Sequence, residues 1–351
     1  MKKNCIKKNT LAISYATFVF VAGLFAVALI TYEDITKLTA PFSFSLSDAW
    51  ENIDTIPAIK PTENLPVPGI IPKKRADAQV LNLPTAAAAA IVDVSSGEIL
   101  YEKMSTQKRA IASITKLFTA MVVIDNIEDL RTKITIPQEV FLIEGTRVGC
   151  STSTLCEGER LRTGDKVAAR SLLQAMLIAS ANDAATALAI HIGGSEEGFS
   201  QIMNAKAREL NLVNSNFCRP SGLERDNAQA ELACYSSARD LGILMATLVK
   251  DEKYQEIEEI LQMTSATFTG EDATIRHNVS STNKLLTKDF GFEVIGKTGF
   301  TLRAGPSLIM MGRQSALRQD VVAVVLDDPD RFEDITKMLT WAFANHSWYD
   351  Q

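Results

Sequence analysis

An uncharged apolar segment near the N-terminus constrains the chain before any motif is considered. No residue from 9 to 32 carries a charge, and about 20 apolar residues in a helix are enough to cross the roughly 30 Å core of a bilayer. Four lysines precede the segment and two acidic residues follow it. The positive-inside rule therefore predicts a cytoplasmic tail over 1–8, an anchor over 9–32 and an extracytoplasmic remainder.

A cleaved signal sequence is the alternative to an uncleaved anchor. Ala26-Val27-Ala28 has the small residues of a cleavage site, but the apolar run is longer than the about 7–15 residues that a signal peptide needs. The length favours the anchor.

Proline then sets the start of the folded part. Seven of the eleven prolines lie between the apolar segment and residue 85, and proline is excluded from helix interiors and central strands. We expect residues 33–85 to be mainly a spacer, with a short helix near 46–53, and residues 86–351 to form one folded domain.

Apolar periodicity in this domain predicts strands at both ends and helices between them. Two apolar runs around Ser95-Ser96-Gly97 predict a hairpin. Three further strands are expected over 293–300, 306–314 and 320–328. Helices are expected over 114–127, 170–194 with a break near residue 180, 196–210, 236–249 and 331–348. This order is typical of an α+β fold with an antiparallel sheet built from both chain ends and a helical subdomain.

Charge and composition exclude some functions. The formal net charge is −6, and the four N-terminal lysines leave −10 for the rest of the chain. An acidic body argues against a nucleic-acid partner. There is no Cys-x-x-Cys pair or His/Cys cluster to suggest a metal site, and no cofactor is indicated.

Four cysteines follow the apolar segment: Cys150, Cys156, Cys218 and Cys234. An even set outside the cytoplasm predicts disulfides, and four cysteines allow three pairings. Short sequence separation favours Cys150 with Cys156 and Cys218 with Cys234.

Ser113 and Lys116 are the candidate nucleophile and base. A lysine three positions after a serine at a helix start lies one turn away on the same face, and a serine nucleophile needs a base within hydrogen-bond reach. The spacing recurs at Ser105 and at Ser281, so by itself it is a weak signal. A helix cap followed by a solvated lysine is the alternative for Ser113, but only Lys116 runs into a long amphipathic helix.

Two more motifs follow in order: Ser180-Ala-Asn182 after an apolar helix, and Lys297-Thr298-Gly299 on a predicted strand. The triple Ser-x-x-Lys, Ser-x-Asn and Lys-Thr-Gly resembles that of penicillin-binding proteins and serine β-lactamases. Over about residues 86–350, AIASITKLFTAMV, RPSGLERDNA and IGKTGFTLRAG are similar to D-alanyl-D-alanine carboxypeptidases of the low-molecular-mass penicillin-binding proteins. The resemblance implies a DD-peptidase/β-lactamase-like α+β fold.

It also implies catalytic roles. Ser113 would attack the carbonyl between the two D-alanines of a peptidoglycan stem peptide and form an acyl-enzyme, and Lys116 would take its proton. Ser180 would relay a proton to the leaving amine, and Asn182 would hold the substrate backbone and the lysine. An ordinary lysine, with a pKa of about 10.4, is a poor base, so burial and the nearby charge of Lys297 would have to lower the pKa of Lys116.

The resemblance adds Lys297 to the catalytic residues and implies a substrate-binding set of Thr298, Gly299, Phe300 and Arg303. Lys297 and Thr298 would bind the terminal carboxylate of the stem peptide. The backbone N–H of Phe300, with that of the nucleophile, would form the oxyanion hole. β-Lactams would then be covalent inhibitors.

The sequence departs from the family at Cys234, where a histidine commonly precedes the Tyr-Ser stretch. This indicates a disulfide that holds the loop. Three alternatives remain: a peptidoglycan endopeptidase, a serine β-lactamase, and a non-enzymatic wall-binding protein. A β-lactamase needs a carboxylate that activates water; Glu224 and Asp226 are candidates, although a solvated loop is the favoured interpretation of both.

Overall fold

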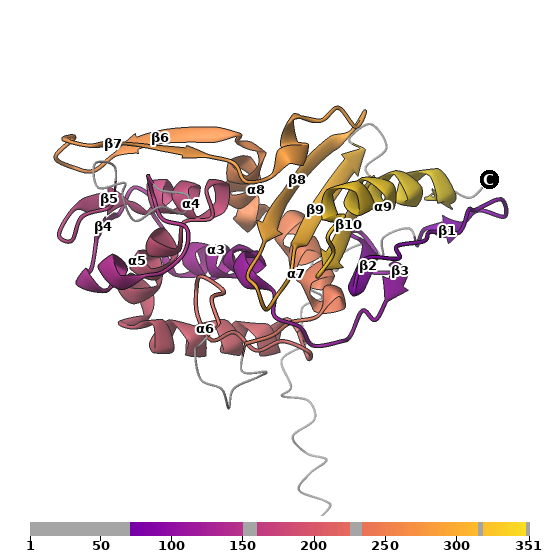
Figure 1. Ribbon diagram of the computed structural model, residues 1–351, viewed down its shortest axis with the longest axis horizontal. Coiled ribbons are helices and arrows are strands. Elements are labelled where there is room, and N and C mark those ends of the chain that lie inside the picture. Colours follow the sequence, from indigo (N-terminus) through magenta and orange to yellow (C-terminus); the bar gives the residue numbers. More distant parts are fainter. Residues whose placement is uncertain (1–70, 150–159, 225–233, 315–318, 349–351) are drawn as a thin grey trace, which may run out of the picture. The chain divides into compact units, whose positions relative to one another are not determined.

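The computed structural model describes residues 71–149, 160–224, 234–314 and 319–348. The chain divides into two units, Met1–Leu65 and Pro66–Gln351, and the described residues all belong to the second (Figure 1). The predicted anchor, most of the predicted spacer and the helix expected near 46–53 lie outside the described residues. Among the described helices, none has the length and apolar character needed to span a membrane.

A five-stranded antiparallel sheet forms the centre of this unit, in the order β3-β2-β10-β9-β8. Its strands are β2 Ala88–Asp93, β3 Ile99–Lys103, β8 Glu293–Gly299, β9 Ser307–Gln314 and β10 Gln319–Leu326. The N-terminal hairpin and the three C-terminal strands were all predicted, and the sheet does combine both ends of the chain. The expected α+β class is confirmed.

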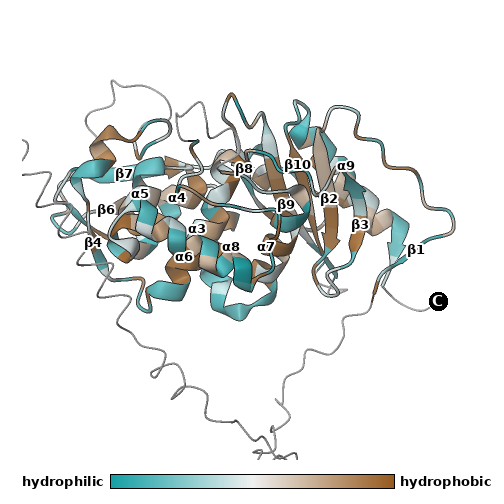
Figure 2. Cartoon of the chain, turned by 90° about the horizontal axis from the view of Figure 1, so that it is seen from below, coloured by the Kyte–Doolittle hydropathy of each residue, from teal (hydrophilic) through white to brown (hydrophobic). Residues whose placement is uncertain are grey.

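The sheet is buried on both faces, which explains its nearly continuous apolar strands. On β10, Val322, Val324 and Leu326 lie in a core shared with the helical part. The alternate residues Val321 and Val325 lie in a second core, against α9 (Arg331–Asn345). Side chains alternate between faces along a strand, so β10 contributes to both cores. Figure 2 shows apolar residues along β2, β9 and β10.

Helices pack on both faces of this sheet (Figure 1). α7 (Ala238–Lys250) covers β2 and β10, and α9 covers the opposite face. The other helices are α3 Thr115–Asn126, α4 Ala169–Ile178, α5 Asn182–Gly193, α6 Glu196–Glu209 and α8 Gln255–Gln262. Serine hydroxyls cap two of the predicted helices, Ser195 at α6 and Ser237 at α7. The predicted break near residue 180 separates α4 from α5.

Short elements were not predicted, because they contain too few residues to show a period. They include two small hairpins, β4 (Lys133–Thr135) with β5 (Lys166–Ala168) and β6 (Ser265–Thr269) with β7 (Arg276–Ser280). Four 3-10 helices also occur in the described part: η2 Ala112–Ile114, η3 Gln138–Leu142, η4 Glu252–Tyr254 and η5 Lys284–Thr287.

The folded domain begins earlier than the predicted residue 86. β1 (Lys73–Lys74) pairs with β11 (His346–Ser347), Leu83 is buried, and the indole N–H of Trp341 donates to the carbonyl oxygen of Gln79 at 2.7 Å. Proline is compatible with an edge strand. The last part of the predicted spacer, from about residue 73, therefore belongs to the folded domain.

Replacing Leu339 by alanine tests the core between α9 and the sheet. Leu339 is fully buried there, so Leu339→Ala is expected to lower the free energy of unfolding by about 2–5 kcal/mol, measured by urea denaturation. Val80→Ala is the control, because Val80 is 91% exposed. Equal stability of the two variants would contradict this account of the core.

Candidate active site

Ser113 and Lys116 lie where a 3-10 turn runs into α3, a helix in which nine residues are buried. Ser113 is in η2, and Lys116 is in the first turn of α3. Ala112 has a φ of 46°, a left-handed conformation that is uncommon for residues other than glycine. Lys116 is fully buried, and its Nζ lies 2.8 Å from Ser113 Oγ. The alternative of a solvated lysine is therefore wrong.

The Lys116 amine has three oxygen partners. Besides Ser113 Oγ, Nζ donates to Asn182 Oδ1 and to the carbonyl oxygen of Ser221, both at 2.7 Å. An ammonium has three N–H donors, so its hydrogen bonds are satisfied. A neutral amine has two N–H groups and a lone pair. Because an amide oxygen and a carbonyl only accept, they take the two N–H groups, and the lone pair faces the Ser113 hydroxyl.

The surroundings favour that neutral amine. Burial and the positive charge of Lys297 lower the pKa of Lys116 well below its usual value, while the negative charge of Asp183 opposes them. Asp183 itself is buried, which raises its pKa to about 6 although the backbone N–H groups of Val148 and Ala184 donate to it. Burial and the charge of Lys297, the two causes expected from the sequence, both lower the pKa of Lys116. The opposing effect of the Asp183 carboxylate is not predicted by the sequence.

Asn182 comes from the predicted helix break. It is the first residue of α5, its Nδ2 donates to the Glu144 carbonyl, and its backbone N–H donates to the Thr146 carbonyl, both at 2.7 Å. These bonds fix the amide so that Oδ1 points at Lys116. Ser180 lies in the turn before it, buried and with a φ of 62°. Such strained positions cluster at functional sites.

Strand β8 delivers the Lys-Thr-Gly motif to the nucleophile. Lys297 and Thr298 are buried. Gly299 faces the turn that carries Ser113, since an added Cβ would lie 2.8 Å from the carbonyl oxygen of Ile111. Thr298 Oγ1 lies 2.6 Å from the hydroxyl of Thr282. The structure thus brings the third motif against the first.

Phe300 and Arg303 follow β8 and are exposed, with Phe300 showing 59% of its surface. Both side chains therefore lie at the surface beyond the end of β8. Between them, the Thr301 hydroxyl donates to Glu224 Oε1 at 2.6 Å. Glu224, one candidate for a water-activating carboxylate, is therefore paired with a side chain and not freely solvated. The other candidate, Asp226, lies outside the described residues.

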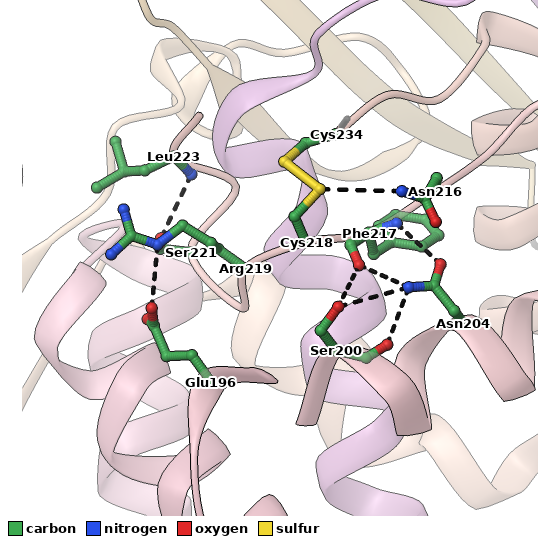
Figure 3. Close-up of a disulfide and its surroundings, with 10 residues drawn as sticks. All are labelled: Glu196, Ser200, Asn204, Asn216, Phe217, Cys218, Arg219, Ser221, Leu223 and Cys234. Atoms are coloured by element: carbon green, nitrogen blue, oxygen red, sulfur yellow. Dashed lines mark hydrogen bonds and ion pairs between the residues drawn. A yellow bond between two sulfur atoms is a disulfide. The ribbon is translucent and has the colours of Figure 1, made fainter. Parts of the chain in front are cut away.

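One of the two favoured cysteine pairs is a disulfide, Cys218 with Cys234 (Figure 3). Cys150 and Cys156 lie outside the described residues.

Sequence reasoning missed three contributors. Ser221 acts through its backbone carbonyl, which leaves no side-chain signal, although it lies in the RPSGLERDNA segment. Thr282 donates its backbone N–H to Ile178 at 3.3 Å and so ties the end of α4 to β8. Arg331, assigned only to an amphipathic helix, donates to the Gly299 carbonyl at 2.7 Å. Its charge adds to burial in lowering the pKa of Lys297 to about 7.

A family model described as D-alanyl-D-alanine carboxypeptidase matches residues 75–330. The chain belongs to this family. The match starts ahead of the predicted domain start, in agreement with the early edge strand, and covers all three motifs.

Relatives within the family include two kinds of enzyme by name. D-alanyl-D-alanine carboxypeptidase DacF of Bacillus subtilis is 32% identical over 269 residues, which is 74% of this chain and 63% of DacF. A D-alanyl-D-alanine endopeptidase of Escherichia coli is 31% identical over 260 residues, which is 72% of this chain and 76% of that protein. The chain thus spans less than two thirds of DacF.

Solved structures in the family share the fold. Penicillin-binding protein 6B of Escherichia coli aligns with a TM-score of 0.63 and 27% identity over 77% of this chain and 80% of that one. Penicillin-binding protein D2 of Listeria monocytogenes in a cefotaxime-bound form aligns with a TM-score of 0.61 and 29% identity, over 76% of this chain and 99% of that one. The expected DD-peptidase fold is confirmed.

The low pKa of Lys297 predicts how stability depends on pH. Because its pKa of about 7 in the folded protein lies below the ordinary 10.5, folding releases a proton between these values, and the free energy of unfolding rises with pH across this window. Lys297→Met removes the titrating group, so this rise should be smaller in urea titrations from pH 7 to 10. Lys284→Met, at an exposed lysine, should keep the wild-type slope. Identical slopes for wild type and Lys297→Met would contradict the shift.

Proposed function

We propose that the protein is a serine carboxypeptidase that removes the terminal D-alanine from peptidoglycan stem peptides. The observation that carries this proposal is the buried amine of Lys116, held by Asn182 Oδ1 and the Ser221 carbonyl so that its lone pair faces Ser113 Oγ. This is the arrangement that turns a serine into a nucleophile. The family match and the DacF likeness supply the substrate class.

The first half of the reaction forms an acyl-enzyme. Neutral Lys116 takes the Ser113 proton, and Oγ attacks the carbonyl carbon of the penultimate D-alanine. The C–N bond then breaks, and terminal D-alanine leaves with a proton relayed through Ser180. In the second half, water attacks the ester, gives up a proton to Lys116, and releases the shortened peptide with the Ser113 hydroxyl restored. The net reaction is hydrolysis of one peptide bond.

The terminal carboxylate fits the end of β8. Lys297 is buried beside the nucleophile and supplies a positive charge when it is protonated. A bound carboxylate favours that charged form. Thr298 adds a hydroxyl, and exposed Arg303 adds a second cation at the outer edge. The backbone N–H groups of Ser113 and Phe300 are assigned to the developing oxyanion.

An endopeptidase that cuts the cross-link between two stem peptides is the second candidate. The endopeptidase of Escherichia coli is matched over more of its length than DacF is, 76% against 63%. The chemistry on Ser113 would be the same, with a side-chain amine of a neighbouring peptide as the leaving group.

Labelling with a fluorescent penicillin tests the nucleophile. Wild type and Ser105→Ala should be labelled covalently, and Ser113→Ala should not. Ser105 is the matched control, because it has the same spacing to a lysine but donates to Glu102 at 2.7 Å. Labelling of Ser113→Ala would refute the assignment, and fast release of the label would indicate a β-lactamase.

Mass spectrometry of digests then separates the candidates. A pentapeptide losing one D-alanine supports the carboxypeptidase, and cross-linked dimers split into monomers without that loss support the endopeptidase. Binding without turnover of either substrate would indicate a wall-binding protein.

For localisation, we propose a bacterial membrane protein whose catalytic domain lies outside the cytoplasm, anchored in the lipid bilayer by residues 9–32. Support comes from the uncharged run with its basic flank and from the disulfide between Cys218 and Cys234, since such bonds persist in oxidising compartments.

Membrane fractionation tests the anchor. The full chain should stay in the membrane pellet after an alkaline wash, and a variant with Phe20→Arg and Leu24→Arg should lose this retention, because each charge near the centre of a span costs about 2.5–3.5 kcal/mol. The N-terminal mass of the mature protein decides between an anchor and cleavage after Ala28. Retention of the double variant would contradict the anchor.

A further inference from the structure

The Ser221 carbonyl orients the Lys116 amine through a hydrogen bond of 2.7 Å. The contacts that fix Ser221 in place therefore affect the orientation of the base. Of the two acceptors that orient the Lys116 amine, Asn182 lies on a helix, whereas Ser221 lies in an irregular loop. Loops open more easily than helices. The position of the carbonyl therefore depends on the ties that the loop makes to its surroundings.

The loop is tightly confined on its inner side. The backbone N–H of Gly222 donates to the Arg219 carbonyl at 3.2 Å and closes a turn around Ser221. Gly222 has a φ of 78°, and an added Cβ would overlap the carbonyl oxygen of Ala112. The turn thus rests directly on the backbone next to Ser113. At Gly222 the Ala112 backbone blocks inward movement, so a displacement of the turn there is directed outward.

Three non-covalent ties oppose outward movement of the turn. One lies three residues after Ser221, where Glu224 Oε1 accepts from the Thr301 hydroxyl at 2.6 Å. Thr119 donates its hydroxyl to the Pro220 carbonyl at 2.7 Å, and Arg219 pairs with Glu196 at 3.0 Å. The ion pair is partly exposed, and such pairs contribute little in water. Figure 3 shows Arg219 and Ser221 on the stretch of chain that leaves Cys218.

The other end of the disulfide is well anchored. Next to Cys234, Tyr235 and Asn216 exchange two backbone hydrogen bonds of 2.8 and 2.9 Å. Ser236 and Arg109 exchange another two, of 2.8 and 3.0 Å, and Arg109 lies four residues before the nucleophile. Cys234 therefore belongs to a small backbone ladder connected to the segment that carries Ser113.

We propose that Cys218 and Cys234 are positioning residues for the catalytic base, since their disulfide fixes the chain three residues before Ser221 and keeps its carbonyl on the Lys116 amine. This inference rests on the proposed function. The backbone of Phe217 is still held, since its N–H donates to Asn204 Oδ1 at 2.9 Å and its carbonyl accepts from Asn204 Nδ2 at 2.6 Å. The disulfide adds a covalent tie at the next residue, where the turn begins. Without it, the turn can move outward, water reaches the amine, and the lone pair no longer faces Ser113.

The test compares acylation by a fluorescent penicillin in two double variants. Cys218→Ser with Cys234→Ser removes this disulfide, and Cys150→Ser with Cys156→Ser is the matched control. In the first variant the acylation rate constant should fall by about 10- to 100-fold, as a displacement of about 1 Å at a reacting group does, while the dissociation constant of the initial complex changes by less than about 2-fold. The control should acylate like wild type.

The pH profile separates positioning from a merely structural role. Burial is the main cause of the low pKa of Lys116, so entry of water should move the acidic limb of the acylation profile to higher pH. The Cys150/Cys156 double variant, treated with a mild reductant below its unfolding temperature, should reproduce both changes, and reoxidation should reverse them. This arm applies even if the Cys218/Cys234 variant fails to fold. Unchanged rate and acidic limb after verified reduction would overturn the proposal.

NMR of protein with 13C-labelled lysine distinguishes a failure of the positioning role from a failure of the proposed function. The pKa of Lys116, read from its Cε resonance and assigned with Lys116→Arg, should rise on reduction whether or not penicillin reacts. Absence of wild-type acylation would refute the proposed function, whereas an unchanged Lys116 pKa would refute the positioning role.

Discussion

The buried amine of Lys116 is the group on which the rest of the structure depends. Removing a charged group from water costs several kcal/mol even after relaxation, so the position is tolerable only with every N–H paired or with the proton released. Ser113, Asn182 and Ser221 provide the pairing from three separate segments. The turn before α3, the start of α5 and the loop after α6 therefore have to come together at Lys116 Nζ.

The sheet supplies the second half of this electrostatic arrangement. The charge of Arg331, at the start of α9, lowers the pKa of Lys297 on β8, and the charge of Lys297 lowers the pKa of Lys116; burial acts in the same direction on both lysines. A cationic site of this kind suits a carboxylate ligand, whose charge would relieve the mutual repulsion. Arg331 lowers the pKa of Lys297, whereas a carboxylate bound beside Lys297 would raise it and favour the charged form.

The sequence predicted the elements and side-chain motifs well where a long apolar pattern existed. The strands buried on both faces and the main helices follow from apolar runs and apolar spacing, and the helix break at Ser180 follows from the turn-forming and cap-forming residues gathered there. Two-residue edge strands and the small hairpins have no such pattern, so the domain start was placed too late. The carbonyl of Ser221 could not be found at all, since a backbone oxygen is present at every position and only the fold decides which one meets Lys116.

The two decoy serines show why spacing alone is insufficient. Ser105 donates to Glu102, and the Ser281 hydroxyl accepts from the backbone N–H of Asn283 at 3.1 Å. Each of these two hydroxyl groups is hydrogen-bonded to a residue two or three positions away. Ser113 differs because the chain folds distant residues around it.

The sheet order has a consequence for how the protein is made. β2 hydrogen-bonds to β10, with Ala88 opposite Leu326, so the hairpin of β2 and β3 has its central partner only after the long segment up to β10 has been synthesised. Chains emerge N-terminus first, and pairing between such distant segments is intrinsically slow. Until β10 arrives, β2 presents an open apolar edge of the kind that aggregates. The interval between the synthesis of β2 and that of β10 is therefore the stage at which the nascent chain is most exposed to aggregation.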